Sequence, residues 1–132
     1  MIGKQLTVLT GNSTQRVGNI FSLLSDEGVN VRAHCLVDNG NGNCKLRMVV
    51  SEPDRAVGIL QKSKFAVVVN DVVIVETDDR PGGLSRLLGL FAGKDVRIEY
   101  SYTAASESPG IAVMVFRFSD NAKASKILKV RS

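Results

Sequence analysis

The sequence of 132 residues predicts an α+β chain built from two consecutive copies of one unit. When the chain is shifted by 67 residues against itself, residues 4–36 align with the second half without gaps, and after a hairpin the shift becomes 68. In both halves, strand-like and helix-like apolar patterns follow in the same order. We expect one unit in residues 1–70 and the other in residues 71–132, with one extra hairpin residue in the second copy.

The first unit begins with a strand over residues 5–10 and a helix over residues 16–27. The helix is predicted by four apolar residues at helical spacing: Val17, Ile20, Phe21 and Leu24. Gly28 then provides a C-cap. Apolar alternation over residues 29–37 and 44–50 predicts two half-buried strands, which leaves polar side chains on the outer face. These outward residues are Asn30, Arg32, His34, Lys45 and Arg47.

The rest of the first unit is a helix and a strand. Ser51 and Asp54 have capping-box spacing, and Pro53 suits a first helical turn, so we expect a helix that runs to about Lys62. A fourth strand is expected over residues 65–69.

The second unit repeats this order with strands over 72–77, 96–103 and 110–118 and helices over 83–92 and 120–129. Only three residues follow, so we expect its final strand to be missing or truncated, or its edge to be completed by another chain. Strand-helix-strand-strand-helix-strand units with antiparallel sheets and the helices on one face define the ferredoxin-like βαββαβ plait. Tandem units of this fold are our prediction.

The second-unit sheet is expected to differ from the first on its outer face. Ile111, Val113 and Val115 would present an apolar surface there, whereas Phe116 and Phe118 would face the helices. Tyr100 and Tyr102 are also assigned to the buried face. Because an apolar outer face is commonly an interface, we expect a homodimer.

Composition excludes several classes of function. Apolar residues make up 44% of the chain, and the net charge of +4 comes from dispersed Lys and Arg residues without a run. We therefore expect no nucleic-acid partner, since a binding footprint is a clustered basic patch. The N-terminus lacks a signal-peptide apolar segment and no stretch reaches membrane-span length. We expect a soluble, cytoplasmic protein with no membrane partner.

Two cysteines lie on either side of an Asn-Gly pair. A two-residue turn at Asn39-Gly40 would place Cys35 opposite Cys44, where a disulfide is geometrically conceivable. We prefer two buried, reduced thiols, as is usual in the cytoplasm. With a single histidine, no metal site or other cofactor is expected.

The most informative motif is the turn before the helix at residue 83. It reads Asp78-Asp79-Arg80-Pro81-Gly82-Gly83-Leu84. The first N–H groups of a helix lack intrahelical partners and favour a carboxylate. Glycines allow close approach of a ligand to the backbone, and proline fixes the entry to the helix. Asp79 is placed to pair with an ammonium group.

This turn, the tandem repeat and the strand Val96-Arg97-Ile98-Glu99-Tyr100-Ser101-Tyr102 together resemble tandem ACT-domain proteins over about residues 4–129. The resemblance implies a regulatory module that binds small ligands, usually amino acids, at interfaces between paired units. It also implies that the turn contacts the ligand's charged ends, and that an Asn at the start of a neighbouring second strand completes the pocket. The implied ligand-binding residues are Asp79, Arg80, Pro81, Gly82, Gly83, Leu84 and Asn30.

The corresponding positions elsewhere depart from this pattern. In the first unit, Thr14 stands in place of Pro81, and Gln15-Arg16 in place of Gly82-Gly83. Arg97 occupies the position equivalent to Asn30. The second set of candidate ligand-binding residues is therefore Asn12, Ser13, Thr14, Gln15, Arg16, Val17 and Arg97.

The sequence thus predicts a non-catalytic regulatory module that binds a free amino acid and acts on a partner enzyme or transcription factor. One alternative is a structural or partner-interaction domain that has lost its ligand. RNA binding is a third reading, because RNA-recognition domains share the plait, but the required aromatics are missing from the open face. Because no nucleophile–base pair, metal cluster or cofactor fingerprint is visible, we expect no enzymatic activity.

Overall fold

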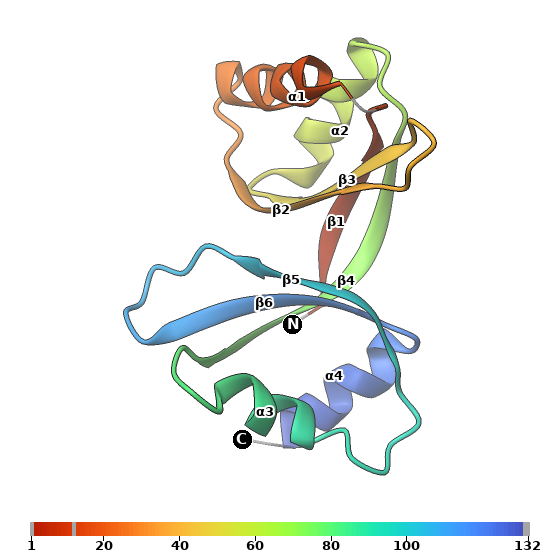
Figure 1. The fold of residues 1–132 in the computed structure, drawn as a ribbon. Helices are drawn as coiled ribbons and strands as arrows, with labels where there is room; N and C mark the ends of the chain where they lie inside the picture. Colours follow the sequence, from red (N-terminus) through yellow and green to blue (C-terminus); the bar gives the residue numbers. More distant parts are fainter. Residues whose placement is uncertain (1, 12, 131–132) are drawn as a thin grey trace. The chain divides into compact units, whose positions relative to one another are not determined.

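The structure, a computed structural model, describes residues 2–11 and 13–130, apart from the side chain of Val130. These residues form six strands and four helices (Figure 1). The elements are β1 (Ile2–Leu9), α1 (Thr14–Asp26), β2 (Val31–Asp38), β3 (Cys44–Val50), α2 (Pro53–Lys62), β4 (Val67–Asp78), α3 (Gly83–Gly89), β5 (Ile98–Ala104), β6 (Ile111–Phe118) and α4 (Asn121–Val130). The chain divides into two compact units: a first unit, Lys4–Asn70, and a second unit that comprises Asp71–Ser132 and the start of β1.

In the first unit the strands follow the order β2-β3-β1-β4. β3 pairs antiparallel with both β1 and β2. α1 and α2 lie on the same face of these strands (Figure 1). This is the predicted ferredoxin-like arrangement, and the prediction of the fold class is confirmed.

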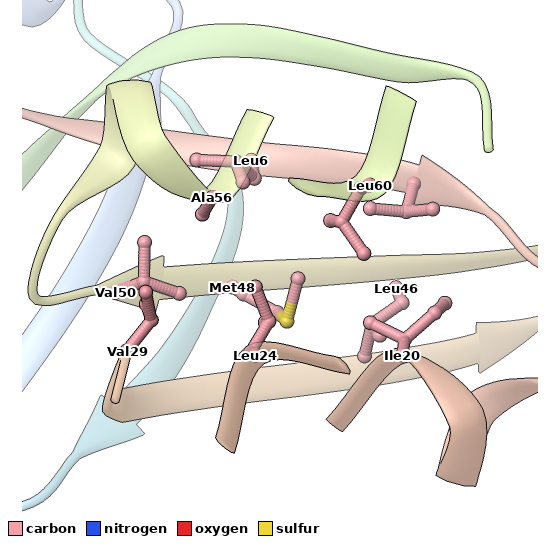
Figure 2. Close-up of a cluster of buried hydrophobic side chains, with 10 residues drawn as sticks. Leu6, Ile20, Leu24, Val29, Leu46, Met48, Val50, Ala56 and Leu60 are labelled. Atoms are coloured by element: carbon pink, nitrogen blue, oxygen red, sulfur yellow. The ribbon is translucent and has the colours of Figure 1, made fainter. Parts of the chain in front are cut away.

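The first-unit core lies between that sheet face and the two helices. Ile20 and Leu24 of α1 and Leu60 of α2 point towards Leu46 and Met48 of β3 (Figure 2). All five side chains are fully buried. Burial of each large apolar side chain contributes roughly 1.5–3 kcal/mol of free energy. These contacts therefore stabilise the packing of the helices on the sheet.

The second unit has the order β4-β6-β5, again antiparallel, with α3 and α4 on one face (Figure 1). Its core contains Phe116 and Phe118 of β6, as predicted, together with Leu87 of α3 and Leu128 of α4. The loop between β5 and β6 is one residue longer than the loop between β2 and β3, as the change of repeat offset predicts.

The boundary between the two units falls inside a strand. We expected separate strands over 65–69 and 72–77, but β4 runs unbroken from Val67 to Asp78. On either side of the boundary, side chains tie the strand to its own unit. Thr7 Oγ1 donates to Asn70 Oδ1 at 3.0 Å, while Arg117 Nη1 and Asn121 Nδ2 both donate to the Asp71 carbonyl, at 3.0 and 2.9 Å. Polar Asn70-Asp71 is thereby accommodated in the middle of a strand.

The second unit also takes Ile2 and Gly3 from β1. A Cβ on Gly3 would lie 2.6 Å from Ile74 Cδ1, so β1 begins in contact with a β4 side chain. No strand follows α4 in the described part of the chain, which ends at Val130.

The register of the β2–β3 hairpin differs from the prediction. The loop spans residues 39–43, Asp38 pairs with Cys44, and Cys35 pairs with Arg47, so the predicted Cys35–Cys44 pairing is wrong. A shift by an odd number of residues moves side chains to the opposite face. Accordingly His34, expected to point outward, packs edge-on against Phe21 of α1 with ring centroids 5.5 Å apart.

The faces of β5 are reversed in the same way. Tyr100 pairs with Arg117 and Tyr102 with Val115, after a register shift between Ile98 and Tyr100. Because Phe116 faces the helices, the alternating Val115 and Arg117 face away from them, and both tyrosines lie on that outer side. Their predicted place on the helix-facing side is therefore wrong, although Tyr102 is buried as expected.

Two helix termini also differ from expectation. α3 begins at Gly83 as predicted but ends at Gly89, and the next three residues continue with i→i+3 hydrogen bonds to Leu87, Leu88 and Gly89. α2 begins at Pro53 as predicted, but its N-cap, Glu52, makes no side-chain capping bond. The predicted capping box at Ser51 does not form.

Candidate ligand-binding site

The turn between β4 and α3 depends on two glycines in different ways. Gly82 is the N-cap of α3 in the left-handed conformation, with φ 88°, which is costly for other residues. Gly83 is buried, and a Cβ at this position would overlap the carbonyl oxygen of Asp78. Thr77, also buried, donates through Oγ1 to the Gly83 carbonyl at 3.1 Å. The turn is therefore pulled tightly against the end of β4.

Beside this turn the second unit has a hollow of about 570 Å³. The whole predicted segment from Asp79 to Leu84 borders it, and so does Asp78, the first residue of the motif. Five further lining residues were not singled out from sequence: Thr77, Ser85, Thr103, Ala112 and Met114. Leu84 is 47% exposed, an unusual degree for a leucine. With Ala112 and Met114 it gives the hollow an apolar side, while the turn supplies polar groups.

Charged groups of both signs surround the turn. Asp78 Oδ2 lies 3.4 Å from Arg80 Nη2 and 3.4 Å from Arg86 Nη2. The Asp78 side chain is 44% exposed, so these pairs are weak and open to exchange with a solute. Asp79, the carboxylate proposed from sequence, is exposed and donates its backbone N–H to the Gly110 carbonyl.

Asn30 and Arg97 occupy equivalent places in the two units and are held identically. Asn30 N donates to Ser51 Oγ at 2.9 Å, and Arg97 N donates to Ser119 Oγ at 2.9 Å. In return, each serine N–H donates to the carbonyl of the same partner, at 2.9 and 2.8 Å. Both side chains are exposed. Each lies just before the second strand of its own unit, and Arg97 does not border the hollow.

The first-unit turn is built differently. Ser13 caps α1 by accepting a hydrogen bond from Arg16 N at 3.3 Å. The Arg16 side chain donates through Nε to the Thr10 carbonyl at 2.9 Å, and its guanidinium lies 4.9 Å from the centre of the Phe65 ring. Thus Arg16, which replaces Gly83, covers its own turn. Thr14, Gln15 and Val17 lie in the first turn of α1, and Asn12 lies outside the described residues.

The sequence therefore located one wall of the hollow and missed the other. A signal for Thr77 was present, because Thr10 and Thr77 are among the few identities between the repeats, and both are buried. Thr103, Ala112 and Met114 depend on strand register and have no local signature. The pairing of Thr103 with Met114 brings them beside the turn.

Other site chemistries find little support in the described residues. No cluster of three or more His, Cys, Asp or Glu side chains is placed to hold a metal ion there. Both cysteines are free thiols, Cys44 buried and Cys35 partly so. Burial, and secondarily the Asp38 carboxylate, raises the pKa of the Cys44 thiol.

Among the helices described, none combines the length and apolarity needed to span a bilayer.

Comparison with known proteins gives one family match and several structural matches. A family model described as an ACT domain pair matches residues 1–131. The crystal structure of a protein from Bacteroides thetaiotaomicron is 34% identical, with a TM-score of 0.90 over 99% of this chain and 89% of that one. The ligand-free regulatory subunit of aspartate kinase from Thermus thermophilus shares the fold at 13% identity, with a TM-score of 0.70 over 98% and 94% of the two chains. No curated protein matches the sequence.

Proposed function

Since the chain belongs to the ACT family as a pair of ACT domains, whose members are typically regulatory and ligand-binding, we propose that it is a non-catalytic regulatory module that binds a free amino acid. The ligand binds in the second-unit hollow. The observation that carries this proposal is the combination of opposite charges, a hydroxyl and an apolar wall around one glycine turn.

A free amino acid requires all three kinds of group. Its ammonium finds a carboxylate in Asp78 or Asp79, and its carboxylate finds a guanidinium in Arg80. Small-molecule sites are typically apolar hollows with a few orienting polar groups. Leu84 and Met114 supply the apolar contact and Thr103 supplies a hydroxyl.

We propose that the turns of the two units differ in ligand binding. In the first unit, Arg16 stands at the position of Gly83, and its side chain donates to the Thr10 carbonyl and lies over the Phe65 ring. We assign binding to the second-unit turn, with Asp79 to Leu84 as its core. A role for Asn30 in ligand binding belongs to the same proposal. The alternative, a partner-interaction domain without a ligand, gains support only from the covered first-unit turn.

We propose that the module forms a homodimer, that it acts in the cytoplasm, and that ligand binding changes its association or the activity of a partner enzyme or transcription factor. Free thiols are in line with a reducing compartment. The aspartate kinase relative from Thermus thermophilus is itself a regulatory subunit, which is in line with this role.

Isothermal titration against the twenty amino acids tests the proposal. At least one amino acid should bind, and an Arg80→Gln substitution should weaken that binding, because Arg80 borders the hollow. By contrast, Arg16→Gln, the matched change at the first-unit turn, should leave it unchanged. No heat with any amino acid at millimolar concentration would contradict ligand binding and favour the partner-interaction alternative. Sedimentation with and without the ligand tests the dimer.

A further inference from the structure

The exposed loop between β2 and β3 carries two Asn-Gly pairs, Asn39-Gly40 and Asn41-Gly42. In such a pair the glycine nitrogen can attack the side-chain amide carbon of the asparagine, because glycine has no Cβ to hinder the approach. A new C–N bond closes a succinimide ring, the bond to the side-chain nitrogen breaks, and ammonia leaves with the proton of the backbone nitrogen. Water then opens the ring to aspartate or isoaspartate.

The two pairs share the same local sequence chemistry but differ in hydrogen bonding. Asp38 Oδ1 accepts a hydrogen bond from Gly40 N at 2.9 Å. Gly40 N must lose its proton to attack Asn39, and the adjacent carboxylate disfavours the negative charge that this creates. Among the described residues, none accepts a hydrogen bond from Gly42 N. Gly42 N, the backbone nitrogen that follows Asn41, is therefore the available nucleophile.

We propose that Asn41 is a site of spontaneous deamidation and that Asp38 protects Asn39 from the same reaction. Asn41 is exposed, so water reaches the succinimide. The second unit has no counterpart, because its loop over residues 105–110 contains no asparagine.

The modified residue lies close to the first-unit turn. Thr10 N donates to the Cys44 carbonyl at 3.1 Å, and the Gly42 carbonyl oxygen lies 3.8 Å from the position that a Cβ on Gly11 would take. Deamidation at Asn41 therefore adds a negative charge, and in the isoaspartyl form a backbone methylene, beside this turn. As deamidated protein accumulates, the first-unit turn therefore becomes more different from the second-unit turn.

Peptide mapping by mass spectrometry, after incubation of the full chain at mildly alkaline pH, tests the proposal. Asn41 should deamidate about fivefold faster than Asn39, which corresponds to a hydrogen bond worth ~1 kcal/mol. In urea the two rates should converge. Asp38→Ala, which removes the side-chain acceptor, should raise the rate at Asn39 to that of Asn41 without changing the rate at Asn41.

Several outcomes would overturn this inference. Equal rates in the folded protein, or faster loss at Asn39, would contradict the difference in hydrogen bonding. An unchanged rate at Asn39 in Asp38→Ala would exclude Asp38 as the cause. Circular dichroism of that variant checks that it folds. If it does not, the comparison of folded and urea-treated wild-type protein still decides the matter.

Discussion

Adjacent residues of the same type have separate tasks in this protein, as Gly82 and Gly83 show. Gly82 supplies a left-handed φ, whereas Gly83 gives room for the Asp78 carbonyl. From sequence we attributed both to close approach of a ligand. In the structure the chain itself makes the close approach at Gly83, so this glycine shapes the turn before any ligand is present.

Gly83→Ala should destabilise the protein by about 1–3 kcal/mol, the usual cost of forcing extra atoms into a packed region. Gly89→Ala is the matched control, because a Cβ there meets no atom within 4 Å. It should leave stability unchanged or raise it by up to ~1 kcal/mol, since alanine favours a helix. Urea unfolding measures both, and equal stabilities would disprove the steric role of Gly83.

The Cys44 thiol should make stability depend on alkaline pH. Its pKa is raised above the ordinary value of 9.0, chiefly by burial. The folded state therefore holds the proton more tightly, so the contribution is complete below pH 9.0 and is lost as pH rises through the higher folded pKa. In a Cys35→Ala background, the unfolding free energy should fall in this range, and more steeply than when Cys44 is also replaced by alanine. Identical slopes would contradict the shift.

At the scale of the elements, both units contain the same pair of hydrogen bonds. In each unit, the pair joins the residue before the second strand to a serine before the second helix. These serines are Ser51 and Ser119. The sequence predicts that Ser51 caps a helix, but its hydroxyl instead accepts a hydrogen bond from Asn30 N, just before β2. This connection fixes the backbone at Asn30 and Arg97.

Ser51→Ala should cost about 1 kcal/mol, the typical net contribution of one hydrogen bond. Ser119→Ala should cost a similar amount in the second unit. Ser22, exposed on α1, provides the control, and its replacement by alanine should be neutral or slightly stabilising. Thermal unfolding of the three variants gives the comparison, and a neutral Ser51→Ala would contradict the role of the bond.

Element types could be read from local patterns, whereas sheet faces could not. Apolar spacing located α1, Pro53 marked the start of α2, and the turn motif placed the start of α3 at Gly83. The resemblance to ACT domains was confirmed by the family match. Asn39-Gly40 suggested a two-residue turn, but Gly42 also adopts a positive φ and the loop uses five residues. That difference reversed the face of β2.

The same limit applies to the hollow. Its turn could be predicted because glycine, proline and aspartate have strong local preferences. Thr103 and Met114 join it only through the register of β5 and β6, which includes an irregularity between Ile98 and Tyr100. No local pattern encodes such a shift, so the strand wall formed by Thr103, Ala112 and Met114 was not predictable from the sequence.

For the whole molecule, the principal feature is that β1 and β4 each supply residues to both compact units. An exposed linker normally separates domains, and few contacts cross it. Here the position between the repeats is the interior of β4, where the Asp71 carbonyl accepts two side-chain hydrogen bonds.

Insertion of a short Gly-Ser segment between Asn70 and Asp71 should therefore destabilise the protein by ~2 kcal/mol or more, because two hydrogen bonds of ~1 kcal/mol each are disturbed along with the strand. The same insertion between Ala105 and Ser106, in the exposed β5–β6 loop, should be tolerated. Urea unfolding distinguishes the two proteins. Equal tolerance at both positions would show that β4 behaves as a linker.

The continuity of β4 also bears on how such a chain can be inherited and rearranged. The sequence repeat suggests gene duplication of a piece that ends near Asn70, but a crossover at this point would join half of one strand to a foreign continuation. A single repeat cut out at Asn70 would carry only part of β4, so the pair of repeats is the smallest piece that keeps this strand whole.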